Sequence, residues 1–150
     1  HIGSQMAKEI LGRLKCSSAR VENVSTAVAN HMKFASVDRM RESTWRKMIA
    51  EPTFATEMEL NRVDCISCHG KMDGYLLMLD RWRSLGDTPA VPPLPVGGHD
   101  LIRLGVKPGP ELGRILAILR DEFLEGKRKT REELLKFAGV LIKNRKKLAK

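Results

Sequence analysis

The residues best suited to ligate a metal lie in one short run, Cys65-Ile66-Ser67-Cys68-His69. The pattern C-x-x-C-H is the attachment signature of c-type haem, and the two cysteines can also ligate zinc, with His69, Cys16 or His31 completing the site. Haem attachment requires export, and no export signal is visible. A second C-x-x-C pair is absent as well. We therefore favour a structural role in which the run closes a helix at Gly70.

A second candidate pair, His99-Asp100, resembles the centre of a metal-dependent HD-type phosphohydrolase. Such a site needs further histidines and a distant aspartate, and only His31 and His69 remain once His1 is set aside. Asp100 fits better as a helix cap whose carboxylate accepts a backbone amide of the first turn. We predict no metal ligand and no catalytic residue here.

Basic residues carry the stronger functional signal. The 27 Lys and Arg against 18 Asp and Glu give a net charge of +9, which favours a polyanionic partner. Each cation that neutralises a phosphate adds a salt-dependent contribution to binding. Aromatic residues are scarce, which favours recognition of a folded duplex backbone over stacking on single-stranded bases. The candidate nucleic-acid-binding residues are Arg103, Lys107, Arg114, Arg120, Lys127, Arg128, Lys129 and Arg131, with Lys143, Arg145, Lys146, Lys147 and Lys150 following near the end of the chain.

Glycine and proline place the first of these cations around a corner between two helices. A short apolar helix stops at Gly105, as a helix does when a left-handed residue follows its end. Pro110 suits the first turn of a second helix, which ends at Gly126. The N-terminus of this second helix lies beside Lys107 and Arg114, which makes it a suitable place for a phosphate.

The rest of the sequence also contains residues typical of helix starts and ends. We expect a helix that is capped by Ser17 or Ser18 and reaches Met32, a short helix capped by Ser43, and a last helix that starts with the capping box Thr130-x-x-Glu133. Further helices are expected over residues 54–68, opened by Thr53, and over 72–85. No run of alternating β-branched residues stands out, so the predicted class is all-α, with a multi-helical body and tail and the helix-corner-helix around Gly105–Pro110.

Four parts are expected along the chain. Residues 1–6 have the character of a cloning remnant and are set aside from the fold. A helical body covers 7–86, a segment rich in Pro and Gly covers 87–97, and a helical tail covers 98–150. No apolar run approaches the roughly 18 residues that span a bilayer. Three cysteines without a secretory signal favour reduced thiols and a cytoplasmic protein.

The corner carries a family resemblance. Gly98, Asp100, Leu101, Leu104, Gly105, Pro108, Gly109, Pro110, Gly113 and Leu116 match the run G-x-D-L-x-x-L-G-x-x-P-G-P-x-x-G-x-x-L. This region resembles the C-terminal body and tail of bacterial class II tRNA nucleotidyltransferases and their poly(A) polymerase relatives. The similarity extends from about Leu11 to about Leu135. It departs from the family at Cys68, where a serine is usual.

The resemblance implies a role in tRNA processing. Nucleotidyl transfer needs carboxylates that hold metal ions and a Gly-Ser loop that grips the triphosphate. Beyond residues 1–6 the chain has neither a Gly-Ser loop nor a D-x-D motif. The family carries these in an N-terminal head that would use Mg²⁺ and nucleoside triphosphates, so this fragment should be inactive alone and needs no cofactor itself. The expected partner is tRNA or another folded RNA, whose 3′ end the chain would position for the head.

Two other functions remain open. One is a metal or haem protein built on Cys65, Cys68 and His69. The other is a helix-turn-helix DNA-binding module that uses the same corner. The second helix begins Pro-Glu-Leu-Gly, which offers few side chains able to read base edges, so the DNA-binding interpretation is the less favoured.

Overall fold

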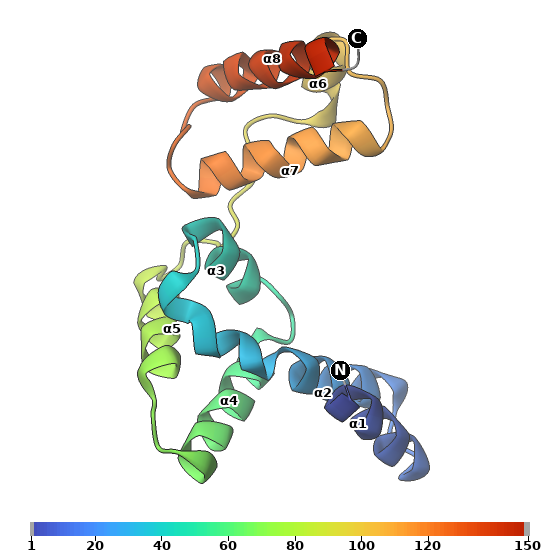
Figure 1. Ribbon diagram of the computed structural model, residues 1–150, viewed down its shortest axis with the longest axis vertical. Helices are drawn as coiled ribbons and strands as arrows, with labels where there is room; N and C mark the ends of the chain where they lie inside the picture. The colour runs from blue at the N-terminus through green and yellow to red at the C-terminus, as the bar shows by residue number, and fades with distance from the viewer. Residues whose placement is uncertain (1, 149–150) are drawn as a thin grey trace. The chain divides into compact units, whose positions relative to one another are not determined.

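The computed structural model describes residues 2–148, with side chains described up to residue 144. Over this range the chain forms α-helices and one 3₁₀ helix and contains no β-strand, which confirms the all-α class (Figure 1). It divides into two compact units. The first unit comprises residues up to 40 together with 44–90, and the second comprises 41–43 and 91–150. The chain passes from the first unit to the second after residue 90, which lies inside the predicted Pro- and Gly-rich segment. The bounds given above for the body and the tail stay a prediction.

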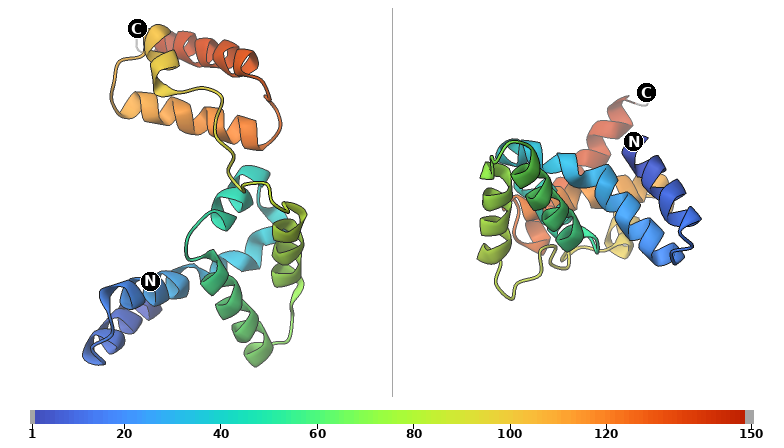
Figure 2. Two further views of the ribbon diagram at one scale, coloured as in Figure 1. Left: turned by 180° about the vertical axis from the view of Figure 1, so that it is seen from behind. Right: turned by 90° about the horizontal axis from the view of Figure 1, so that it is seen from below.

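In the described part of the chain, six helical segments lie before residue 90. Helices α1 and α2 lie side by side and run antiparallel (Figure 2). The 3₁₀ helix η1 continues directly from α2 and contacts α2, α4 and α5. The bounds are α1 (Ile2–Arg13), α2 (Ser18–Asn30), η1 (His31–Arg39), α3 (Glu42–Ile49), α4 (Phe54–Cys68) and α5 (Asp73–Ser84).

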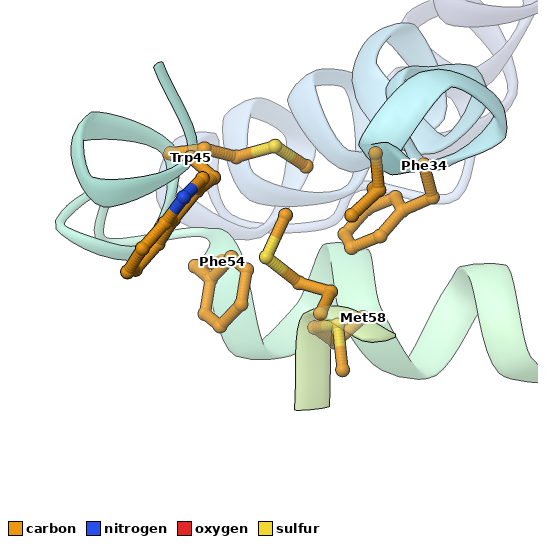
Figure 3. Packing of buried hydrophobic residues seen from close by; sticks show 7 residues of the cluster. Phe34, Trp45, Phe54 and Met58 are labelled. Carbon is orange, nitrogen blue, oxygen red and sulfur yellow. The ribbon is translucent and has the colours of Figure 1, made fainter. Parts of the chain in front are cut away.

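The core of the first unit is built from aromatic and methionine side chains. Phe34 of η1, Trp45 of α3, and Phe54 and Met58 of α4 meet in one cluster (Figure 3). The rings of Phe34 and Phe54 lie 6.4 Å apart between centroids. Trp82 of α5 meets the Phe54 ring edge-on at 5.1 Å. Because one cluster collects side chains from four segments, helices too short to be stable alone hold one another in place.

A buried carboxylate joins α2 to α4. Glu57 is 1% exposed, and its Oε1 accepts hydrogen bonds from Asn30 Nδ2 and Thr53 Oγ1, both at 2.7 Å. Burying a carboxylate is costly unless hydrogen bonds compensate it, and these two donors do so. Thr53 precedes α4 as expected, but its hydroxyl donates to Glu57 and caps no helix amide.

Three expectations for the first 50 residues need correction. Residues 2–6, set aside above, lie in α1, where Ser4 Oγ donates to Ser25 O at 2.8 Å. The helix expected to reach Met32 ends as an α-helix at Asn30 and continues as η1. Ser43 is not a cap, because α3 begins at Glu42 and the buried Ser43 hydroxyl donates to Glu125 Oε1 at 2.8 Å. Ser17 does cap α2, by accepting from the amide of Arg20.

The second unit contains α6 (Gly98–Arg103), α7 (Pro110–Leu124) and α8 (Arg131–Leu148). Helices α7 and α8 form an antiparallel hairpin, and α6 contacts both (Figure 1). Their core contains Leu101, Leu119 and Leu134, each completely buried. The capping box that starts α8 is confirmed: Thr130 N–H donates to Glu133 Oε2 at 3.1 Å and Glu133 N–H donates to Thr130 Oγ1 at 3.2 Å. None of the described helices has the length and apolar character needed to cross a membrane.

Close packing of α5 against η1 requires a glycine at position 74. A Cβ placed on Gly74 would lie 2.5 Å from the backbone oxygen of Phe34. A backbone atom cannot move aside as a flexible side chain does, so any side chain here forces the two segments apart. Gly12 in α1 offers the opposite case, because no atom lies within 4 Å of a Cβ added there.

We therefore expect Gly74→Ala to lower the free energy of unfolding of the first unit by about 1–3 kcal/mol, the usual range for overpacking. Gly12→Ala should leave it unchanged or raise it by up to about 1 kcal/mol, because alanine is the better helix former. Trp45 and Trp82, the two tryptophans, both lie in this unit, so urea unfolding followed by tryptophan fluorescence measures it. Equal effects of the two substitutions would contradict the packing account.

Candidate nucleic-acid interface

The corner between α6 and α7 is fixed by backbone hydrogen bonds. Gly105 follows the end of α6 with φ at +89°, and its N–H donates to Ile102 O at 2.9 Å. The next amide, of Val106, donates to Leu101 O at 3.0 Å. This is the Schellman arrangement, in which Val106 packs back onto the helix it has just left. Leu101 and Val106 are both buried, so the corner predicted from Gly105 is confirmed and anchored in the core.

The second helix starts where Pro110 predicts. Gly109 precedes it with φ at +145°, a conformation that favours glycine, and Pro110 occupies the first turn. Glu111 lies in the same turn. Its negative charge opposes the positive end of the helix dipole, so anion binding here depends more on neighbouring cations than on the helix terminus itself.

Five of the eight candidate cations are exposed and form no ion pair with any residue whose side chain is described. Arg103 lies in the last turn of α6, Lys107 lies in the corner, and Arg114 lies in the second turn of α7. Arg120 lies farther along α7, and Lys129 lies in the loop before α8. Three exposed cations thus accompany the corner within twelve residues of sequence. Whether any of them contacts a nucleic acid stays a prediction.

Two of the other candidates are held by acidic residues at the end of α7. Lys127 Nζ lies 2.7 Å from Glu125 Oε2 and 3.7 Å from Glu122 Oε1. Arg128 pairs with Glu122, and its guanidinium lies 3.6 Å from the centre of the Phe137 ring. Their charges are already balanced within the unit, which makes them weaker candidates for phosphate contacts than the five unpaired cations.

Arg131 of α8 and Asp100 of α6 form a bidentate ion pair. Arg131 Nη1 lies 2.8 Å from Asp100 Oδ2, and Nη2 lies 2.5 Å from Oδ1. Asp100 Oδ2 also accepts the amide of Gly97 at 3.0 Å. Asp100 therefore does cap α6, but from the third residue of the helix and through the amide of the residue that precedes the helix, and not through an amide of the first turn as predicted. The hydrogen bond from Arg131, followed by that from the Gly97 amide, holds the pKa of Asp100 well below its usual range. Sequence reasoning missed this pair because its members lie 31 positions apart.

The C-x-x-C-H run lies at the end of α4 in the first unit. Cys68 Sγ donates to Asp64 Oδ1 at 3.6 Å, and the negative charge of Asp64 raises the pKa of the Cys68 thiol, which disfavours the thiolate that binds metals. His69 Nδ1 accepts the amide of Lys71 at 3.0 Å. Among the described residues, no three His, Cys, Asp or Glu side chains are grouped so that they could hold a metal ion. Gly70 closes the helix with φ at +69°, as the structural interpretation predicts.

Of the terminal cations, Lys143 is exposed on α8. The side chains of Arg145, Lys146, Lys147 and Lys150 lie outside the described residues.

Because the pKa of Asp100 is lowered in the folded protein, the stability of the second unit should depend on pH in a definite direction. A carboxyl whose folded-state pKa is depressed contributes stability above its unfolded value, about 3.9, and that contribution is lost as pH falls towards the folded-state pKa. Asp100→Asn should therefore lower the melting temperature of the second unit at pH 7, and the difference from the unchanged protein should shrink at pH 3. Far-UV circular dichroism measures the melting, and tryptophan fluorescence reports the first unit separately.

Asp87→Asn, at an exposed residue of the first unit, is the matched control and should have no such effect. A difference for Asp100→Asn that is the same at pH 7 and pH 3 would argue against an ion pair with Arg131.

Comparison with known proteins identifies the family. The model for tRNA nucleotidyltransferase domain 2 matches residues 1–138. The A-adding tRNA nucleotidyltransferase of Deinococcus radiodurans is 28% identical over 144 residues, which cover 91% of this chain and 33% of that protein. The mitochondrial CCA tRNA nucleotidyltransferase 1 of Mus musculus is 35% identical over 65 residues, covering 43% of this chain and 13% of that protein. The CCA-adding enzyme of Limosilactobacillus fermentum is 45% identical over 51 residues, covering 33% and 13%.

No solved structure matches the chain. The chain spans a third or less of the length of each of these three relatives. The family model, in contrast, covers all but the last twelve residues and runs through both units. The chain therefore belongs to the tRNA nucleotidyltransferase domain 2 family.

Proposed function

We propose that this chain is the RNA-binding region of a tRNA nucleotidyltransferase. It holds tRNA, or a similarly folded RNA, so that the 3′ end reaches a nucleotide-adding head in the full-length enzyme. The observation that carries this proposal is the set of exposed, unpaired cations Arg103, Lys107 and Arg114 around a rigid corner. The printed names of the relatives supply the expectation that the RNA is tRNA.

The distribution of aromatic side chains supports contact with the RNA backbone. Phe34, Trp45 and Phe54 are committed to the core of the first unit, and Trp82 is the one aromatic side chain that is exposed in the described part of the chain. Recognition of single strands depends on exposed rings that stack on bases, and such rings are nearly absent. Recognition of a duplex depends on phosphate contacts and shape, for which exposed cations on a rigid corner suffice.

Nucleotide addition itself is assigned to the remainder of the full-length enzyme. The curated relatives are at least three times as long as the parts of them that match this chain. We expect the chain alone to bind RNA without extending it. Mg²⁺ and nucleoside triphosphates would be used by the head, in the cytoplasm.

The binding surface is tested with Arg103→Gln, Lys107→Gln and Arg114→Gln combined in one variant. Binding of labelled tRNA is followed by fluorescence anisotropy between 50 and 200 mM salt. Each lost phosphate contact should reduce the slope of log K against log salt concentration by about 0.7–0.9, so the full loss is roughly 2–3. Affinity at 50 mM salt should fall by more than tenfold.

A control variant carries Arg20→Gln, Lys33→Gln and Arg83→Gln, which remove the same charge from exposed positions of the first unit. It should keep most of the affinity and the salt slope. Equal losses in the two variants would reduce the effect to net charge and contradict a localised surface. Tighter binding of duplex DNA than of tRNA would favour the helix-turn-helix alternative.

A further inference from the structure

Helix α1 carries a row of exposed apolar side chains. Four of them follow one another at intervals of four residues, which places them along one side of the helix: Ile2, Met6, Ile10 and Leu14. Leu14 directly follows α1 and still continues its turn, because its amide donates to Ile10 O at 3.0 Å. The exposed fractions of the four side chains are 81%, 55%, 49% and 68% in the same order. We call these four residues the α1 stripe.

The adjoining side of α1 is already used for packing on α2. Ser4 Oγ donates to Ser25 O at 2.8 Å, and a Cβ added to Gly3 would lie 3.3 Å from Val28 Cγ1. Helix α2 in turn contacts α4 and η1, so it lies between α1 and the core of the first unit (Figure 2). A surface helix of a globular protein typically turns its apolar side towards its neighbours. Helix α2 covers only a part of that side, and the α1 stripe is the part left uncovered in the described structure.

The arrangement of the stripe distinguishes it from other exposed apolar side chains. In the second unit, Ile118 of α7 and Val140 of α8 are exposed to 43% and 47%. Apolar side chains that are scattered singly over a surface are ordinary and need no partner. A contiguous apolar row is different, because its contact with water is unfavourable along the whole length of the helix. The α1 stripe therefore marks an interface.

The stripe belongs to the family domain itself. The family model matches residues 1–138, which include all of α1. The match to the Deinococcus radiodurans relative covers 33% of that protein, so two thirds of its polypeptide lie outside the matched part. On the proposed function this chain is likewise one region of a longer enzyme, whose remaining polypeptide is available to cover α1.

A segment of the same polypeptide fits the stripe better than a separate partner does. Specific interfaces between separate proteins usually involve about 20–30 residues on each side, and the stripe is much smaller. A segment joined to the chain needs less surface, because the linkage holds it at a high effective concentration. A second copy is also disfavoured, because each copy carries a net charge of +9 and the copies repel one another.

We propose that the α1 stripe is the surface on which the rest of the full-length enzyme docks, through the apolar face of a helix. A helix suits the stripe because rows of side chains spaced four residues apart interdigitate with the same rows of a second helix. The hairpin of α1 and α2 then joins the nucleotide-adding part of the enzyme to the core of the first unit. This inference rests on the proposed function only for the existence of the longer enzyme, and not for the place where RNA binds.

The docking surface is tested with Met6→Gln and Leu14→Gln combined in one variant, made both in this chain and in the full-length enzyme. Both side chains are more than half exposed in the chain alone, so its melting temperature should shift by less than about 2 °C. In the full-length enzyme the docked helix buries both side chains, and the melting temperature should fall by about 5 °C or more. Far-UV circular dichroism measures both transitions.

Ile118→Gln combined with Val140→Gln is the matched control, because it makes the same kind of change at exposed positions of the second unit. The control should shift the melting temperatures of the chain and of the full-length enzyme alike. Equal effects of the two variants on the full-length enzyme would overturn the proposal, as would an unchanged melting temperature of the full-length stripe variant.

Amide hydrogen exchange of the unchanged proteins gives a second reading that needs no substitution. Exchange at residues 3–14 should be at least about tenfold slower in the full-length enzyme than in the chain alone, while exchange at residues 131–144 should be the same in both. Equally fast exchange of α1 in the two proteins would overturn the proposal. A dimer of the chain alone that dissociates in the stripe variant would also overturn it, by assigning the stripe to a second copy.

The same proteins separate this proposal from the RNA-binding function. The stripe variant keeps every lysine and arginine, so the chain carrying it should bind labelled tRNA as tightly as the unchanged chain does. Loss of RNA binding by the unchanged chain together with slow exchange of α1 in the full-length enzyme would contradict only the proposed function. RNA binding together with fast exchange of α1 would contradict only the docking on the stripe.

Discussion

The second unit depends on how the chain turns between α6 and α7. Val106 must return to the core beside Leu101, and it can do so only because Gly105 adopts a left-handed conformation that other residues reach at a cost of roughly 1–2 kcal/mol. The same turn determines where α7 begins. The positions of Lys107 and Arg114 in the chain therefore follow from an apolar contact and a backbone requirement.

The basic residues divide into two groups with different physical roles. Lys127 and Arg128 neutralise Glu125 and Glu122 at the end of α7, and Arg131 neutralises Asp100 and so joins α8 to α6. Arg103 and Lys107 are instead exposed at the corner without such partners among the described side chains. The net charge of +9 shows only that cations are in excess. The ion pairs of the structure show which cations are already paired within the protein and which stay available to a partner.

Local signals were sufficient to predict much of the helical fold. Gly105, Gly126 and the Thr130–Glu133 box mark helix ends through contacts within a few residues, and these predictions are confirmed. Contacts between distant segments left no such signal. Ser43 looked like a cap because its partner Glu125 lies 82 positions away, and residues 2–6 looked dispensable because their packing partners lie in α2. The exposed apolar side of α1 was missed for the same reason, because only the packing of α1 on α2 shows which part of the helix stays uncovered.

The central claim is that the corner between α6 and α7 contacts the RNA backbone, and mapping of backbone amides by NMR during titration with tRNA tests it most directly. The account predicts that the largest changes in chemical shift or intensity occur between residues 103 and 114, and that they diminish as salt is raised. Changes confined to the first unit, or spread evenly over all exposed lysines and arginines, would contradict it.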